Sequence, residues 1–451
     1  MTFKKNHNAI AAAVESLESR TLMSADWYVS NGGDDAAFGA QGSPVATLQA
    51  ALNRAQAGDR ILLSSGTYDG NVRIDTPDLT IRSVPGEMAS IVSPNSDASV
   101  EVTIRIGENA NGTKLKNLDI SGGYYYAVKT ESTWDSGAAD PHGPSNVSIV
   151  GSRIHDSGAD VIKLTPGTNY SQIVNNEIFN SGRTNPDNAE GIDAVQANFA
   201  LVKGNSVHDT TTNGIYYKGG SRNTVIENNW VYNTAHSGIL LGQSSDENWF
   251  DHGFNPGYFE SIDAVVRNNV VWNTEGAGIG AWAALRPTIY NNTLNDVAKS
   301  MFGGLLVQGQ EHWLPSGGAF VSAIIPSQDV TMFNNIVSVS SDRPVLEIRE
   351  GGLVGSLNLS NNLYYQNGGP VVIRDAVSGY EGGLVGWQRR RGHDYASLNA
   401  NPQVNAGADF SLMGNSPAIN RGAATDLSFD FGYGARPLYG AVDIGAHEFA
   451  G

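Results

Sequence analysis

The chain has 451 residues, and its 28 Lys and Arg against 45 Asp and Glu give a formal net charge of −17 at pH 7. An acidic balance argues against the basic footprint of a nucleic-acid-binding protein, and the lack of cysteine excludes disulfide bonds. No apolar run approaches the roughly 18–20 residues that a membrane helix needs, so we expect no membrane span.

Residues 1–25 differ from the sequence that follows. Their end, LESRTLMSA (Leu17 to Ala25), resembles the export segment of many planctomycete proteins, whose pattern is roughly Leu-Glu-x-Arg-x-Leu-Leu-Ser-Ala. Met23 replaces one of the two leucines. The resemblance implies a targeting segment over 1–25 and a protein that is secreted or held at the cell surface.

The next segment, 26–72, is predicted to be an N-terminal cap with a first coil. It contains one helical pattern, from about Val45 to Ala57, followed by a strand pattern. A cap is expected because the open end of a stack of strands exposes core side chains and unpaired strand edges.

A repeat then runs through most of the chain. Its marker is a polar pair, usually Asn-Asn, followed by alternating apolar residues, and short intervals between markers are 23, 24 and 27 residues. The second residues of the pairs are Asn117, Ser152, Asn176, Asn205, Asn229, Asn269, Asn292, Asn335 and Asn362. Each unit holds three short strand patterns separated by turn residues.

Three strands per unit of about 24 residues predict an all-β fold, a right-handed parallel β-helix. Stacked coils bury an apolar ladder, and asparagines aligned at the bends can satisfy backbone groups there. We expect the β-helix to span 73–395 and a C-terminal closing segment to span 396–451. A β-sandwich would not repeat one motif in one register.

Aligning the coils on one isoleucine of each predicts which residues stack. The inward file is Ile162, Ile192, Ile215, Ile239 and Ile279. One position later, Lys163, Asp193 and Tyr216 form an outward file. Lys129 precedes Lys163 by one coil, and Lys218 lies diagonal to Asp193. With coils about 4.8 Å apart, these side chains meet on one face.

Further polar and aromatic residues join that face in this alignment. Asp160, Glu190 and Asn213 stack at the bend before the inward isoleucines, and Trp282 falls in the outward file of Lys218. The preceding strand carries a second outward file: His155, Phe179, His208, Tyr232 and Trp272. Insertions between coils add Trp249, and loops that border a rigid scaffold often form binding sites.

Carboxylates beside lysines suit β-elimination on a uronic-acid polymer. A cation neutralises the substrate carboxylate, and a base then removes the neighbouring C5 proton. We expect Asp160, Glu190 and Asp193 to hold Ca²⁺, which prefers several oxygen ligands. Lys218 would be the base, because a nearby cation or partial burial lowers the pKa of a lysine, and Tyr216 would assist proton transfer or stack.

The same residues carry a resemblance. GADVIK (158–163) and NAEGID, one coil apart, are similar to the Ca²⁺ site of the family 9 polysaccharide lyases, which are pectate lyases on a β-helix. The resemblance implies that Asp160, Glu190 and Asp193 fill three of four ligand positions, while Ala189 occupies the fourth. NGIYYKGG resembles the family's Asn-Gly-aromatic-Lys-Leu-Gly-Gly, with Tyr216 at the position of the base and Lys218 two residues later.

The sequence therefore predicts an exported, monomeric lyase of an acidic polysaccharide, assisted by Ca²⁺. Lys163, Lys129, His208, Trp249 and Trp282 are the expected substrate-binding residues. The alternatives are a non-catalytic carbohydrate-binding or cell-surface β-helix protein, a hydrolase that uses two of the carboxylates, and a C5-epimerase. ADPHG at 139–143 contains the Asp-Pro-His of the mannuronan epimerase motif.

Overall fold

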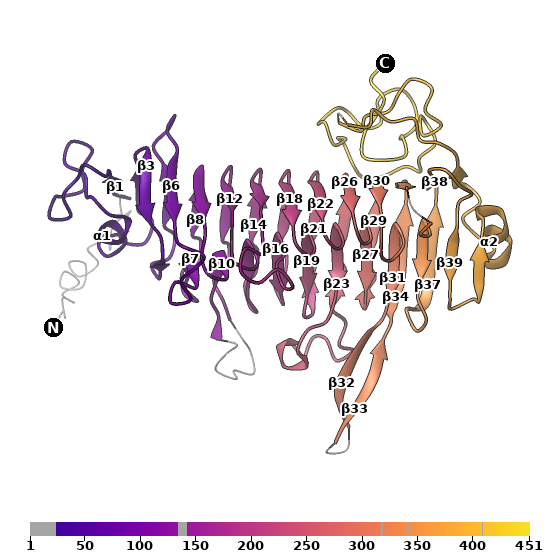
Figure 1. The fold of residues 1–451 in the computed structure, drawn as a ribbon, viewed down its shortest axis with the longest axis horizontal. Coiled ribbons are helices and arrows are strands. Elements are labelled where there is room, and N and C mark those ends of the chain that lie inside the picture. Colours follow the sequence, from indigo (N-terminus) through magenta and orange to yellow (C-terminus); the bar gives the residue numbers. More distant parts are fainter. Residues whose placement is uncertain (1–23, 134–141, 317–318, 341, 408) are drawn as a thin grey trace, which may run out of the picture.

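The computed structural model describes residues 24–133, 142–316, 319–340, 342–407 and 409–451. Most of 1–25, for which a targeting segment is predicted, and the Asp-Pro of the 139–143 motif lie outside these residues. The chain winds into a stack of coils whose strands form three sheets (Figure 1). The pairing is parallel throughout these sheets except between β39 and β40.

Sheet 1 contains β1 (Asp26–Val29), β2 (Arg60–Leu63), β5 (Thr80–Ser83), β8 (Lys114–Lys116), β11 (Ser148–Val150), β14 (Gln172–Val174), β17 (Leu201–Lys203), β20 (Ser221–Arg222), β21 (Val225–Glu227), β24 (Ser261–Ile262), β25 (Val265–Arg267), β28 (Ala284–Leu285), β29 (Thr288–Tyr290), β34 (Ser327–Phe333) and β37 (Leu353–Ser360). Sheet 2 contains β3 (Gly66–Asp69), β6 (Ala89–Val92), β9 (Leu118–Ser121), β12 (Arg153–His155), β15 (Glu177–Phe179), β18 (Ser206–Thr210), β22 (Trp230–Thr234), β26 (Val270–Thr274), β30 (Thr293–Val297), β35 (Ile336–Val339), β38 (Leu363–Gln366) and β41 (Leu398–Asn399).

Sheet 3 contains β4 (Val72–Ile74), β7 (Val102–Ile106), β10 (Tyr126–Thr130), β13 (Ile162–Leu164), β16 (Ile192–Val195), β19 (Ile215–Lys218), β23 (Ile239–Gly242), β27 (Ile279–Trp282), β31 (Leu305–Gln308), β36 (Leu346–Ile348), β39 (Ile373–Asp375) and β40 (Tyr380–Gly382). After β31 the chain leaves the stack in an antiparallel hairpin of β32 (Gln310–Ser316) and β33 (Ala319–Ile325). This hairpin and the C-terminal segment lie on opposite sides of the stack in Figure 1.

The predicted asparagine ladder is confirmed and extends over seven coils. In each step, the Asn side-chain oxygen of one coil accepts the backbone N–H and the side-chain amide of the Asn one coil earlier, for example Asn205 from Asn176 at 3.0 Å for both bonds. The ladder begins at Ser152, whose N–H donates to Asn176, and ends where Asn362 N–H donates to the Ser397 hydroxyl. These buried amides satisfy backbone groups at one bend of each coil in the ladder.

One member of the predicted ladder is wrong by a residue. Asn117 has φ 50°, and strand register pairs Asp119 with Arg153, so Leu118 rather than Asn117 lies opposite Ser152. Asn117 occupies the left-handed position that precedes the ladder in each coil, which Asn tolerates better than most residues. In this coil the polar pair is Lys116-Asn117, so the second residue of the pair lies one position before the ladder.

The N-terminal helix is shorter than the sequence pattern predicts. It covers Leu48–Leu52 (α1), with Thr47 as its N-cap accepting the Ala50 N–H. Val45 is outside the helix because it forms a parallel bridge with Val29. The chain after Asn53 turns toward β2, where Gln56 N–H donates to the Asp59 carboxylate.

At the other end, α2 (Leu384–Arg391) contributes its fully buried Trp387 to the main core. The C-terminal segment instead runs back along the outside of the stack (Figure 1). There its backbone carbonyls accept the side-chain amides of bend asparagines, including Asn228, Asn268 and Asn291. Among the described residues, none of the helices has the length and apolar character to cross a membrane.

Candidate functional site

The stacked files predicted on sheet 3 are present. Lys129 pairs with Lys163 and Lys163 with Asp193 in strand register, and Asp193 pairs with Tyr216. The inward isoleucines are buried, and so are the residues two positions later on each strand. Because side chains alternate along a strand, the residue between them faces out of the coil. The outward file therefore runs through four successive coils, from Lys129 to Tyr216.

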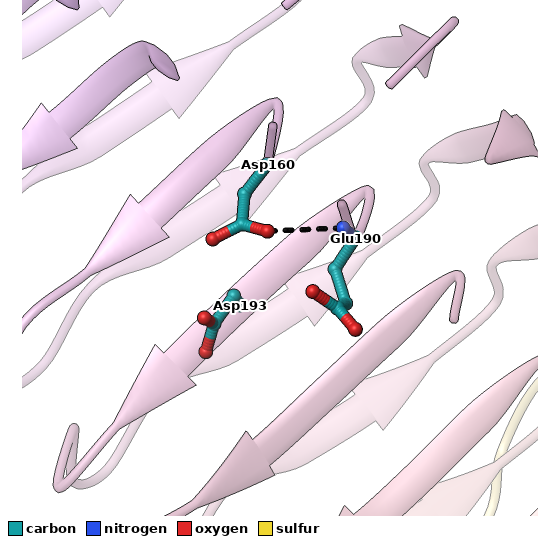
Figure 2. Close-up of side chains that lie close together, drawn as sticks. All are labelled: Asp160, Glu190 and Asp193. Carbon is teal, nitrogen blue, oxygen red and sulfur yellow. Dashed lines mark hydrogen bonds between the residues drawn. The ribbon is translucent and has the colours of Figure 1, made fainter. Parts of the chain in front are cut away.

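Three carboxylates from two neighbouring coils gather at this position (Figure 2). One oxygen from each of Asp160, Glu190 and Asp193 lies within 4.8 Å of the others, and the exposed fractions of these residues are 0%, 4% and 1%. Asp160 Oδ1 accepts the Glu190 backbone N–H at 3.0 Å, while Glu190 Oε1 accepts the Asn213 amide at 3.1 Å. The bends before β13, β16 and β19 position Asp160, Glu190 and Asn213, and Asp193 lies on β16 itself.

The carboxylates are held against strong mutual repulsion. Burial, together with the neighbouring Asp160 charge, raises the pKa of Glu190 to about 8. Asp160 Oδ2, Glu190 Oε2 and Asp193 Oδ1 are buried without a hydrogen-bond partner. Buried carboxylate oxygens in this state cost free energy unless a cation compensates them.

A lysine supplies part of this compensation. The Lys163 ammonium donates a hydrogen bond to Asp193 Oδ2 and lies 3.7 Å from Asp160 Oδ2. Its side chain is 15% exposed. Burial lowers the pKa of Lys163 to about 8, against the Asp160 charge, which raises it.

Lys218 and Tyr216 lie beside the carboxylates on β19. The Lys218 ammonium donates to the Ser244 carbonyl at 3.0 Å and stands 4.6 Å from the centre of the Tyr216 ring. Burial lowers the pKa of Lys218, although the charges of Glu190 and Glu260 oppose the shift. Burial also raises the pKa of the Tyr216 phenol well above its usual value, so this hydroxyl keeps its proton near neutral pH.

The insertion after β23 closes over these groups. Gln243 Oε1 accepts the Asn213 amide at 3.3 Å, and the neighbouring Ser244 binds Lys218. Tyr216 is consequently 2% exposed although it points out of the coil. The lysines keep more exposure than the carboxylates, so a ligand that approaches this face meets ammonium groups first.

Another buried acid, Glu260, supports that insertion and was not predicted as a site residue. Glu260 is fully buried and accepts the Gly219 N–H, the Ser245 N–H and the Ser245 hydroxyl. His312 on β32 places Nε2 at 3.2 Å from Glu260 Oε1 and Nδ1 at 3.4 Å from Glu247. These residues lie in two non-repetitive insertions, so no stacking rule could have paired them.

The other predicted substrate-binding residues are distributed more widely. His208 lies on sheet 2, stacked between Phe179 and Tyr232, with Nδ1 2.7 Å from Asp209. Trp249 ends a short 3-10 helix, η2 (Glu247–Trp249), in the insertion after β23. Trp282 lies on sheet 3, two coils beyond β19, and lines a cavity of about 360 Å³ with Arg349 and Gln308.

The donor set of the carboxylate cluster fits a hard divalent cation. Ca²⁺ takes oxygen ligands at 2.3–2.6 Å, mostly from carboxylates and carbonyls. Asp160, Glu190 and Asp193 each offer one buried oxygen without a hydrogen-bond partner, directed into the cluster. Ala189 is also buried at the bend but offers no side-chain oxygen.

Comparison with known proteins bears on the fold. A family model described as the right handed beta helix region matches residues 103–255. Among solved structures, pectate lyase Pel9A is 14% identical with a TM-score of 0.57, covering 94% of this chain and 96% of its own. The fold is a right-handed parallel β-helix.

Two further solved structures share this β-helix over most of their length. XylC, solved with xylose, is 11% identical with a TM-score of 0.56, and the match covers 93% of this chain and 98% of XylC. The A-module of mannuronan C-5 epimerase AlgE6 from Azotobacter vinelandii is 13% identical with a TM-score of 0.53, covering 80% and 96%. The chain matches no curated protein in sequence.

Proposed function

We propose that this β-helix protein cleaves an acidic polysaccharide by β-elimination at the sheet 3 cluster. The observation that carries the proposal is the placement of Lys218. Its ammonium has a lowered pKa, a neutral carbonyl as its hydrogen-bond acceptor and three buried carboxylates nearby. Lys163, in contrast, donates its hydrogen bond to the Asp193 carboxylate, which favours the charged form of the lysine.

In the proposed reaction, the neutral Lys218 amine removes the proton from C5 of a uronate. The electron pair forms the C4–C5 double bond, and the bond from C4 to the glycosidic oxygen breaks. The leaving oxygen takes a proton from the Tyr216 hydroxyl or from water, which balances the step. Because its pKa is raised, Tyr216 suits the role of acid rather than base.

Asp160, Glu190 and Asp193 would hold a bound Ca²⁺, whose charge would neutralise the substrate carboxylate. Lys129, on the coil before Lys163, would bind a second carboxylate of the polymer. Trp282 and Arg349, at the cavity two coils beyond β19, would contact sugars farther along the chain. Trp249 is a candidate contact from the insertion, whereas the stacking of His208 on sheet 2 favours a packing role.

The likeness to solved structures is consistent with this proposal at the level of the scaffold. Pel9A is a pectate lyase, and AlgE6 is a C-5 epimerase of mannuronan. An epimerase would begin with the same removal of a C5 proton and would return a proton to the opposite face. Product analysis therefore has to separate elimination from epimerisation.

The test is an absorbance screen for unsaturated uronates on pectate, alginate, ulvan and glycosaminoglycans, each with Ca²⁺ and with chelator. We expect a Ca²⁺-dependent rise on one polymer and its loss in Lys218→Ala. Lys203→Ala is the matched control, because Lys203 pairs with Glu227 on sheet 1. Full activity of Lys218→Ala would exclude Lys218 as the base. A flat trace on all polymers would favour a carbohydrate-binding role, and reducing ends without absorbance would indicate a hydrolase.

A further inference from the structure

Lys163 lies inside the carboxylate cluster rather than beside it. Strand register places it one coil before Asp193, and its ammonium bonds Asp193 Oδ2. The same nitrogen lies 3.7 Å from Asp160 Oδ2. One ammonium thus spans two of the three carboxylates, from two successive coils.

A divalent cation bound by the cluster would share the Asp160 and Asp193 carboxylates with Lys163, because the oxygens without a hydrogen-bond partner include Asp160 Oδ2 and Asp193 Oδ1. Ca²⁺ requires oxygens at about 2.3–2.6 Å, and an ammonium that bonds a carboxylate keeps its nitrogen at about 2.7–2.9 Å. A metal on Asp160 Oδ2 and Asp193 Oδ1 would therefore lie beside Lys163 Nζ, which bonds the other oxygen of the Asp193 carboxylate. Two like charges at this separation in a buried site repel strongly.

We propose that Lys163 is a tethered counter-cation of the cluster and competes with a divalent metal for Asp160 and Asp193. It neutralises carboxylates that would otherwise be buried without compensation. A metal can bind only by displacing its ammonium. The affinity of the site for Ca²⁺ is therefore set by Lys163 as well as by the three carboxylates.

Displacement also has a direction. Lys163 belongs to the outward file that continues to Lys129, whose ammonium lies 5.6 Å over the Tyr126 ring. An ammonium released from Asp193 would swing toward this outer side, where Lys129 and Lys163 are only partly buried. If the proposed lyase function holds, metal binding would present a second cation to the polymer.

Calorimetric titration of the full chain with Ca²⁺ tests the competition without any substrate. We expect Lys163→Gln and Lys163→Met to bind Ca²⁺ at least tenfold more tightly than the wild type. Lys203→Met is the control, because Lys203 carries the same charge on another sheet and pairs with Glu227. Its Ca²⁺ affinity should equal that of the wild type.

Equal or weaker Ca²⁺ affinity in the two Lys163 variants would overturn the proposal. Circular dichroism, recorded in Ca²⁺ and in chelator, shows whether each Lys163 variant is folded. A variant that folds only when Ca²⁺ is present supports the competition, since the metal then replaces the lysine, and a variant unfolded in Ca²⁺ and in chelator alike would refute it. Failure of the absorbance screen would remove the lyase proposal and leave the calorimetric result standing.

Discussion

Replacement of Glu190 by glutamine should flatten the pH dependence of stability. Glu190 is 4% exposed between Asp160 and Asn213, and burial with the Asp160 charge raises its pKa to about 8 from 4.5. Between these two values the folded state binds a proton on Glu190 that the unfolded state does not. Its contribution to stability is therefore complete below the unfolded pKa and is lost as the pH rises through the folded pKa.

The size of the effect follows from proton linkage. One proton changes the free energy of unfolding by about 1.4 kcal/mol per pH unit, so from about pH 5.5 to about pH 7.5 the wild type should lose up to about 2–3 kcal/mol relative to Glu190→Gln. His312, whose pKa is lowered by burial but raised overall by Glu260 and Glu247, contributes a loss of the same sign in both proteins. It cancels in the difference.

Guanidinium denaturation of both proteins across this pH range, in chelator, provides the measurement. Glu177→Gln is the control, because Arg153 lowers the pKa of Glu177 and its contribution changes only in more acidic solution. A difference between wild type and Glu190→Gln that stays constant with pH would refute the reasoning, and so would one that grows in favour of the wild type.

Three further predictions concern the ladder, the hairpin and the cavity. Asn269→Ala should lower the free energy of unfolding by about 3–5 kcal/mol, because each buried polar group left without a partner costs about 1–3 kcal/mol. Asn109→Ala, at an exposed position, should change the free energy of unfolding by less than about 0.5 kcal/mol. Equal losses in the two variants would contradict the ladder argument. His312→Phe should speed protease cleavage within 310–325, because Glu260 loses its counter-ion, and an unchanged cleavage rate would exclude this anchor. If the lyase proposal holds, Trp282→Ala should weaken calorimetric binding of long oligomers more than of short ones, and an equal loss for both lengths would exclude a distal contact.

The stacked residues could be predicted because their positions depend on one repeated rule. Alternation along a strand and alignment of the isoleucines placed Lys163, Asp193 and Tyr216 in one file, and strand register confirms it. The polar-pair marker failed by one residue at Asn117, because this asparagine takes the left-handed position that precedes the ladder. Here a pattern based on residue identity was weaker than one based on backbone conformation.

The environment of the site could not be predicted in the same way. Outward residues of a coil are normally exposed, yet Asp193 and Tyr216 are almost fully buried. The insertion that binds Lys218 through Ser244 has no repeat, and its conformation depends on contacts such as that between Glu260 and His312. Such contacts join residues far apart in sequence, for which a single chain offers no spacing rule.

The asparagine ladder makes the coils interchangeable units. Each ladder asparagine presents the same amide to the coil before it and to the coil after it, whatever the length of the loops between them. A duplicated or deleted coil would therefore find its hydrogen-bond partners already in place. The outward positions are free of that constraint, so a pair of coils carrying carboxylates could be copied along the stack, and the scaffold could acquire or lose a reactive centre without changing its fold.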